Sequence, residues 1–196
     1  VWLKANPTDD DTRKHMTQVW IDSGQFKLAI DYWQTLLDQK PNDSEIMGNL
    51  AGINLKAGDW RTSIEWYIKV ANVAADDANK VAAYQFIGNV AWSKLNSKSL
   101  TAPEVLELAD KGIGALQMAA KLAPKNPKLF GLQASIYNFR ALAHGASWAA
   151  AVDRASAQDL QRISRVLAEE AKKAQGAAVP TNPSPMSGGP AETAGG

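Results

Sequence analysis

The side chains that most often carry chemistry are few in this sequence, and their spacing does not favour catalysis. Neither of the two histidines, His15 and His144, is followed by an acidic residue or a histidine three or four positions later, the spacing that ligates a metal from one helix face. The acidic run 9–11 could attract a cation, but the acidic first turn of a helix explains it. Glu104 and Glu107 stand three residues apart, yet helix capping accounts for Glu104. We therefore expect no catalytic residue, no metal site and no cofactor.

Cysteine is absent from the sequence. Disulfides, thiolate metal sites and cysteine nucleophiles are therefore excluded together, and the composition fits the cytoplasm and the bacterial periplasm or envelope equally. The sequence also lacks a phosphate-binding glycine loop, a GxSxG elbow and an HExxH motif.

Charge and hydropathy exclude two further classes. Lys and Arg number 21 against 20 for Asp and Glu, which leaves a net charge of +1, whereas nucleic-acid binders need clustered cationic charge. No apolar run approaches the roughly 20 residues that span a bilayer. We expect neither a nucleic-acid partner nor direct membrane insertion.

The sequence contains an internal repeat. Residues 23–33 align with residues 57–67 at an offset of 34, and glycine meets glycine, isoleucine meets isoleucine, and aromatic meets aromatic three times. Pro7 and Pro41 share the same spacing. A period of this length indicates a solenoid of helix pairs.

Each repeated position has a physical role. Gly24 and Gly58 fall between two helical patterns, where a left-handed residue lets the chain reverse. An aromatic residue then opens the second helix, a small residue permits a close helix crossing, and another aromatic fills the space beside it. These three positions are Phe26, Ala29 and Trp33 in the first unit and Trp60, Ser63 and Tyr67 in the second.

These residues resemble the tetratricopeptide repeat, whose 34-residue helix pair carries a glycine turn, a small residue, an aromatic and a closing proline. The resemblance covers residues 10–41 and 44–75 best, and Ala75 and Asn54 depart from it where a proline and an aromatic are usual. It implies an all-α, right-handed α-solenoid of about four antiparallel helix pairs that binds other proteins.

Two further units are predicted at residues 80–124 and 127–175. The third has an expanded turn, followed by a capping box at Thr101 and Glu104. The fourth begins after Asn126 and is degenerate, with an alanine-rich stretch and a last helix that we expect to be capped near Ser156. The helical domain as a whole is predicted at residues 8–175.

The two ends differ from the repeats. Residues 1–7 read as the end of a truncated preceding repeat, and residues 176–196 as a disordered tail rich in Pro, Gly and Ala. A further hypothesis is that the exposed end near Trp2 and Trp20, left by the missing helix, pairs with another copy of the chain or with the rest of a longer chain.

The family register implies a peptide-binding groove along the first helix of each pair. Its predicted residues are Lys14, Gln18, Asn49, Gly52, Gln85, Asn89 and Trp92. The same register also places Asp11, Ile21, Asp22, Glu45, Gly48, Leu55, Lys56 and Ser93 in the groove. One subclass of the family binds a double carboxylate with two cations in its third unit. Ala82 and Phe86 stand at those positions here, so we reject that subclass.

We therefore predict a non-catalytic protein–protein interaction scaffold or assembly factor that binds a peptide or a helix in the groove. The alanine-, proline- and glycine-rich tail and the apparent missing N-terminus lead us to hypothesise a bacterial envelope or secretion machine. The alternative is a small-ligand-binding or catalytic helical domain that uses a hollow around Asn89 and Trp92. An open continuous groove favours the first hypothesis, and a deep enclosed pocket favours the second.

Overall fold

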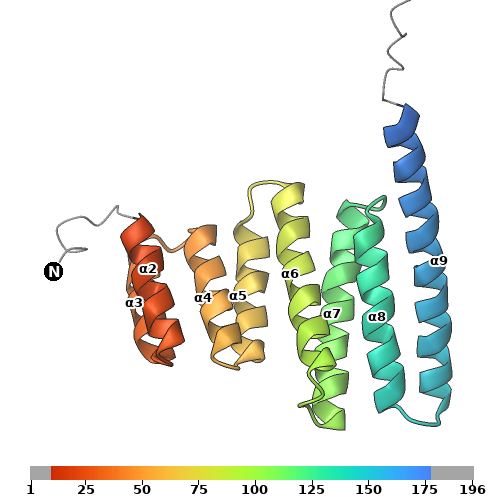
Figure 1. The fold of residues 1–196 in the computed structure, drawn as a ribbon, viewed down its shortest axis with the longest axis horizontal. Coiled ribbons are helices and arrows are strands. Elements are labelled where there is room, and N and C mark those ends of the chain that lie inside the picture. Colours follow the sequence, from red (N-terminus) through yellow and green to blue (C-terminus); the bar gives the residue numbers. More distant parts are fainter. Residues whose placement is uncertain (1–9, 178–196) are drawn as a thin grey trace, which may run out of the picture.

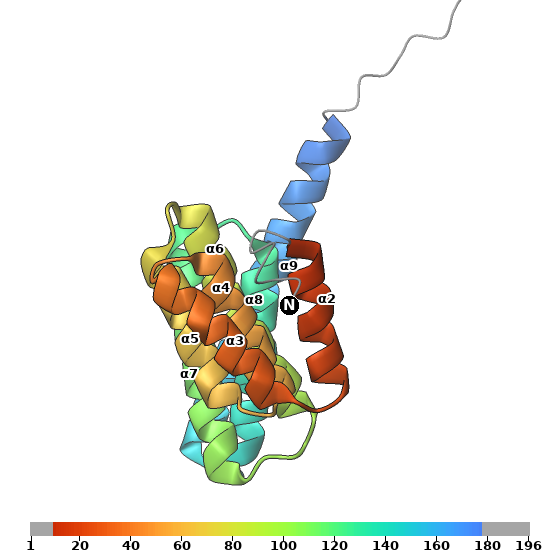
Figure 2. The same ribbon diagram turned by 90° about the vertical axis from the view of Figure 1, so that its left-hand side faces the viewer.

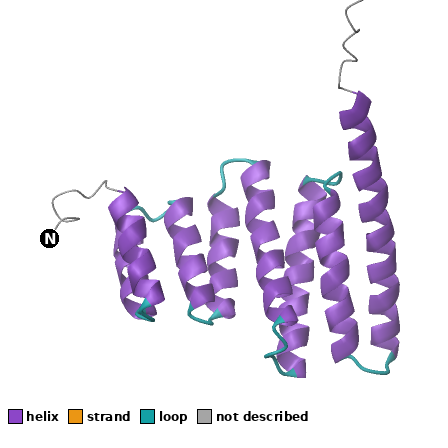
Figure 3. Ribbon diagram, viewed as in Figure 1, coloured by secondary structure: helices purple, strands orange, loops and turns teal. Residues whose placement is uncertain are grey.

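The structure, a computed structural model, describes residues 10–177. Helices are the only regular secondary structure among these residues, and loops and turns join them (Figure 3). The helices are Asp10–Asp22 (α2), Phe26–Gln39 (α3), Ser44–Lys56 (α4), Trp60–Val73 (α5), Asp77–Asn96 (α6), Ala102–Leu122 (α7), Pro127–Ala143 (α8) and Trp148–Ala177 (α9). Residues 1–9, which include the predicted remnant 1–7, and 178–196, most of the predicted tail, lie outside the described residues.

The helices stand side by side in chain order, each antiparallel to the one before it (Figure 1). They form four pairs, α2–α3, α4–α5, α6–α7 and α8–α9, joined by short loops. This arrangement confirms the predicted all-α solenoid. Viewed along the row, α9 projects past the ends of the other helices (Figure 2).

Glycine reverses the chain within three of the pairs. Gly24 and Gly58 have φ of 72° and 92°, and the next helices begin at Phe26 and Trp60, as the repeat predicts. Gly145, with φ of 63°, has the same role between α8 and α9. This third turn was not predicted, because no aromatic residue follows Gly145 at the repeat spacing.

Side-chain caps begin the other helices where the sequence indicates. Asp43 Oδ1 accepts hydrogen bonds from the backbone N–H groups of Glu45 (3.0 Å) and Ile46 (3.1 Å), and Asn126 Oδ1 caps α8 in the same way. The Glu104 carboxylate accepts from the backbone N–H of Thr101 at 3.0 Å, as in the predicted capping box. These bonds satisfy amide groups that have no partner inside the helix.

The predicted helix start near Ser156 is wrong. Helix α9 is continuous from Trp148, and the Ser156 hydroxyl donates to the carbonyl of Val152 within the helix at 3.0 Å. Alanine is the strongest helix former, so the alanine-rich stretch continues the helix, while a back-bonded serine is satisfied without a cap. The same helix extends to Ala177, so Gly176, assigned to the tail, is helical.

The repeat's packing positions are buried as predicted. Ala29 and Ser63 are fully buried, and the Trp33 Nε1–H donates to the Thr17 hydroxyl at 2.9 Å between α3 and α2. Asn54 occupies a position where the repeat usually has an aromatic. Asn54 is buried, and its amide donates to the Leu50 carbonyl at 2.7 Å. The amide nitrogen is therefore paired, although a polar residue stands where the repeat usually has an aromatic.

The third and fourth pairs meet at glycines that have no room for a side chain. A Cβ on Gly112 of α7 would lie 2.6 Å from Ala91 Cβ of α6 and 3.0 Å from Ile136 Cδ1 of α8. A Cβ on Gly88 of α6 would lie 2.7 Å from Leu116 Cδ2. Helices α6, α7 and α8 therefore approach one another more closely than alanine would allow.

We predict that Gly112→Ala lowers the free energy of unfolding by about 1–3 kcal/mol, because the new methyl group forces α6 and α7 apart. Gly114→Ala in the same helix is the matched control, since its Cβ would meet nothing within 4 Å. The control should raise stability by about 0.5–1 kcal/mol through helix propensity. Urea unfolding followed by circular dichroism measures both, and equal shifts would contradict the close crossing.

One arginine connects three helices in the C-terminal half. Arg140 of α8 donates from Nε (3.0 Å) and Nη2 (2.6 Å) to the carboxylate of Asp153 in α9, and from Nη1 to Asp110 in α7. Its guanidinium also lies over the Tyr137 ring, 4.9 Å from the centroid. The hydrogen bonds to Asp153 raise the pKa of Arg140 above its ordinary value, so the guanidinium is charged at physiological pH.

Loss of Asp153 should cost far more than loss of Asp110. The Asp153 side chain is 4% exposed and that of Asp110 is 63% exposed. Asp153→Ala leaves the half-buried guanidinium of Arg140 without its main partner, and we expect the free energy of unfolding to fall by about 3 kcal/mol. Asp110→Ala, in which only an exposed partner is lost, should cost less than about 1 kcal/mol. Thermal unfolding of the two variants tests the difference, and similar losses would show that the buried pair has no special weight.

Candidate functional site

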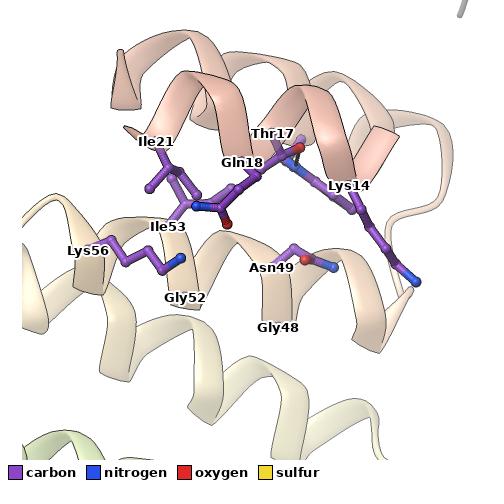
Figure 4. Close-up of a pocket in the computed structure, with 10 residues that line it drawn as sticks. Lys14, Thr17, Gln18, Ile21, Gly48, Asn49, Gly52, Ile53 and Lys56 are labelled. Atoms are coloured by element: carbon purple, nitrogen blue, oxygen red, sulfur yellow. Dashed lines mark hydrogen bonds between the residues drawn. The ribbon is translucent and has the colours of Figure 1, made fainter. Parts of the chain in front are cut away.

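A hollow of about 240 Å³ lies between the first helices of the first two pairs (Figure 4). Side chains of α2 form one wall and α4 forms the other, with the Trp33 ring contributed by α3. The lining residues are Lys14, Thr17, Gln18, Ile21, Trp33, Gly48, Asn49, Gly52, Ile53 and Lys56. The hollow therefore joins two repeats on the side formed by the first helices.

Two glycines one turn apart shape the α4 wall. A Cβ placed on Gly48 or Gly52 would meet no atom within 4 Å, in contrast to Gly88 and Gly112. Each glycine inside a helix costs about 1 kcal/mol relative to alanine. Internal packing does not require glycine at positions 48 and 52. The effect of the two glycines is to keep the α4 wall of the hollow smooth and the helix backbone accessible.

Cations and amides supply the polarity of this hollow. Among the described residues, neither Lys14 nor Lys56 has a carboxylate partner. The Asn49 amide donates to the Glu45 carbonyl at 2.9 Å, which leaves its oxygen available as an acceptor. Gln18 extends from α2 toward α4 and donates to Asp22 at 2.6 Å. The hollow thus offers two ammonium groups and an amide oxygen to a ligand.

A second hollow, of about 330 Å³, adjoins the first. It lies among α4, α5 and α6, and Gly48 lines both hollows. We refer to the two hollows together as the groove. Tyr67 and Phe86 stack in it with centroids 5.2 Å apart and planes 8° apart. Val70, Val73 and several alanines complete an apolar lining. Burial raises the pKa of Tyr67, so its hydroxyl is neutral at physiological pH.

The structure brings four of the seven predicted groove residues together. Lys14, Gln18, Asn49 and Gly52 all line the first hollow. The other three, Gln85, Asn89 and Trp92, lie on α6 and line neither hollow, and Trp92 is 43% exposed. For those three a role in binding stays a prediction.

Two groove residues were not predicted. Tyr67 was assigned to packing, and Phe86 was considered only as the replacement of a cation. Phe86 is 50% exposed, and its ring is covered on one side by Tyr67 of the preceding pair. The sequence signal was weak, because an aromatic at helical spacing usually belongs to the core.

Within residues 10–177 no three His, Cys, Asp or Glu side chains converge in a way that could hold a metal ion. Across the same residues, none of the helices combines the length and apolar character needed to cross a bilayer.

Comparison with known proteins assigns no family. No family model matches the chain, and no curated protein matches it. Among solved structures, a chain described as "MamA RS-1 ArsTM double mutant" is similar over 78% of this chain and 94% of its own length, at 18% identity and a TM-score of 0.30.

Gly48→Ala and Gly52→Ala should each raise the free energy of unfolding by about 0.5–1 kcal/mol, because the methyl groups enter open space and favour the helix. Gly24→Ala is the control. Its positive φ of 72° should make the same change destabilising by about 1 kcal/mol or more. Urea unfolding measures all three, and destabilisation at Gly48 or Gly52 would show a structural need that the packing does not reveal.

Proposed function

We propose that the chain is a non-catalytic protein-interaction scaffold that holds a peptide or helical segment of a partner in the groove formed by the two hollows. The observation that carries this proposal is the pair of helix-interior glycines, Gly48 and Gly52, which open onto the groove without an internal packing role. Glycine permits another backbone to approach a helix closely, and that use offsets its cost to helix stability.

The two halves of the groove suggest different parts of the bound segment. The first hollow presents Lys14 and Lys56 without carboxylate partners in the described part of the chain, so it suits polar or acidic residues. The second hollow presents the stacked rings of Tyr67 and Phe86, so it suits an apolar side chain that anchors the segment.

The character of the lining also supports a binding role over a catalytic one. The residues that line the two hollows include no histidine and no carboxylate, so no general base stands beside the Thr17 hydroxyl or the lysines. Thr17 itself is buried, donating to the Arg13 carbonyl at 2.8 Å and accepting from Trp33. A nucleophile needs a base within hydrogen-bond reach, and this groove provides none.

Site-specific crosslinking tests the proposal. The photo-crosslinking residue p-benzoylphenylalanine in place of Lys56, at the groove, should capture a discrete protein in the cell that makes this chain. The same residue in place of Lys173, on the exposed part of α9, should not. Combining the Lys56 probe with Gly48→Ala and Gly52→Ala should lower the yield about tenfold, equivalent to roughly 1.4 kcal/mol of binding free energy.

Gly114→Ala is the matched control for that pair, because it also adds a methyl group to an open helix glycine but lies on α7, outside the groove. It should leave the yield unchanged. An unchanged yield in the paired variant would move the partner away from the groove and contradict the proposal. The captured protein also tests the hypothesis of an envelope or secretion machine.

A further inference from the structure

Helix α9, the last helix of the solenoid, has large apolar side chains exposed on the face that does not pack on α8. The packed face buries Ala150, Asp153 and Ala157. On the other face, four large apolar residues are between 40% and 83% exposed, namely Trp148, Val152, Ile163 and Val166. We call this face the outer face of α9. The terminal unit of a solenoid normally has a polar outer face, which keeps it soluble, so this one is a candidate interaction surface.

The C-terminal part of α9 extends beyond the rest of the described structure. The Ser164 hydroxyl donates to the carbonyl of Pro127, the first residue of α8, at 2.8 Å. From there α9 continues to Ala177, past the ends of the other helices (Figure 2), and residues 169–175 are all exposed. A helical segment of this length is marginal in water by itself, so contact with another element would stabilise it.

Charged residues are arranged symmetrically about Val166 on the outer face. Arg162 and Glu170 stand four positions before and after Val166, and Asp159 and Lys173 stand seven positions before and after it. Because neighbours in this series are three or four residues apart, the five side chains share one face of the helix. Asp159, Arg162 and Val166 also line one shallow hollow of about 480 Å³, which α9 alone forms. In each symmetric pair of positions, one residue is acidic and the other is basic.

We propose that α9 pairs antiparallel with α9 of a second copy of this chain, around a two-fold axis at Val166. Such an axis places each residue opposite the one at the same distance on the other side of Val166. Arg162 of each copy then faces Glu170 of the other copy, and Asp159 of each copy faces Lys173 of the other. A parallel pair in the same register would bring each charge against its own kind, so the charges favour the antiparallel orientation.

Apolar contact and charge have different parts in this pairing. Val166 and Ile163, which are 49% and 40% exposed, lose exposed surface against the second copy. Within one copy, Arg162 Nη2 donates to Asp159 Oδ1 at 2.7 Å, and these side chains are 73% and 66% exposed. An exposed pair of this kind contributes little to the stability of a single chain. Across the interface the same charges determine orientation and register.

The outer face of α9 is separate from the groove, whose lining comes from α2 to α6. The pairing therefore does not depend on the proposed function. The photo-crosslinking residue at position 173, the control for the groove, should yield only a product of two copies of this chain. Mass spectrometry distinguishes that product from a captured partner of the groove, so failure of one proposal is distinguishable from failure of the other.

Sedimentation equilibrium of the full chain tests the pairing. Wild type should change from monomer to dimer as its concentration rises. Arg162→Glu or Glu170→Arg places like charges opposite each other twice, and each should weaken the dimer at least about tenfold. Arg154→Glu is the matched control, since it makes the same charge change at an exposed residue on a different face of α9. It should change the dissociation constant less than about twofold.

A charge exchange separates a specific contact from a general effect of charge. Arg162→Glu and Glu170→Arg combined in one chain restore opposite charges across the interface, so this variant should dimerise within about threefold of wild type. A mixture of the two single variants should also form a dimer, although neither dimerises by itself. In the mixed dimer, positions 162 and 170 of the two different chains again carry opposite charges.

A single introduced cysteine locates the axis, because the sequence contains no cysteine. Val166→Cys should form a disulfide-linked dimer under mild oxidation, since the two copies of residue 166 meet at the axis. Val152→Cys is the control, on the same face and with similar exposure. Its two copies would lie about 42 Å apart at a rise of about 1.5 Å per residue, whereas a disulfide needs Cα atoms within about 7 Å.

Three results would overturn the proposal. One is a monomer at every concentration. Another is a dimer that Arg162→Glu and Arg154→Glu weaken equally, or that the combined charge exchange does not restore, since either would place the contact elsewhere on the chain. The last is equal disulfide formation at positions 152 and 166. Every substitution is at an exposed side chain, and circular dichroism checks that each variant folds.

Discussion

The distance between α6, α7 and α8 is the constraint on which the rest of the solenoid depends. At Gly112 the backbone of α7 lies against Ala91 on one side and Ile136 on the other, and no side chain fits between them. This close contact aligns the third and fourth pairs, and the larger core cluster of the protein, which includes Leu108, Leu116 and Leu129, forms around it. Arg140 then attaches α9 through a nearly buried carboxylate. The N-terminal end is packed differently, since Thr17 is the single buried residue among the described side chains of α2. The first hollow forms at this less tightly packed end.

Glycine has three different physical uses in this chain. At Gly24 it supplies a positive φ that reverses the chain, and at Gly112 it permits a close approach of two helices. Gly48 and Gly52 do neither, since their φ angles are helical and the space beside them is open. The third use, at Gly48 and Gly52, leaves open space beside the helix, and this use alone does not help the chain to fold. For this reason the glycines of α4 carry more weight in the functional argument than the lysines beside them, because charged surface groups need no special explanation.

Buried polar groups divide in a similar way. Asn54 and Asp153 have partners inside the protein, which account for their burial. Ser63 Oγ has none among the described residues. Ser63 is fully buried and lines neither hollow of the groove, so its unpaired hydroxyl is the cost of a small polar side chain at that position.

The sequence by itself determined the helical solenoid, the turns at Gly24 and Gly58 and most helix starts, because these depend on local backbone preferences and on a repeated spacing. Four of the groove residues implied by the resemblance to the tetratricopeptide repeat, Lys14, Gln18, Asn49 and Gly52, line the first hollow, because the family register fixes which positions of each first helix share one face. The uninterrupted α9 was not predicted, because a serine near alanines is compatible with both a cap and a helix interior. Only the tertiary structure decided which glycines face open space and which aromatic rings of neighbouring pairs stack. Each of these depends on the distance between helices from different repeats, which packing determines and which no spacing along one chain segment records.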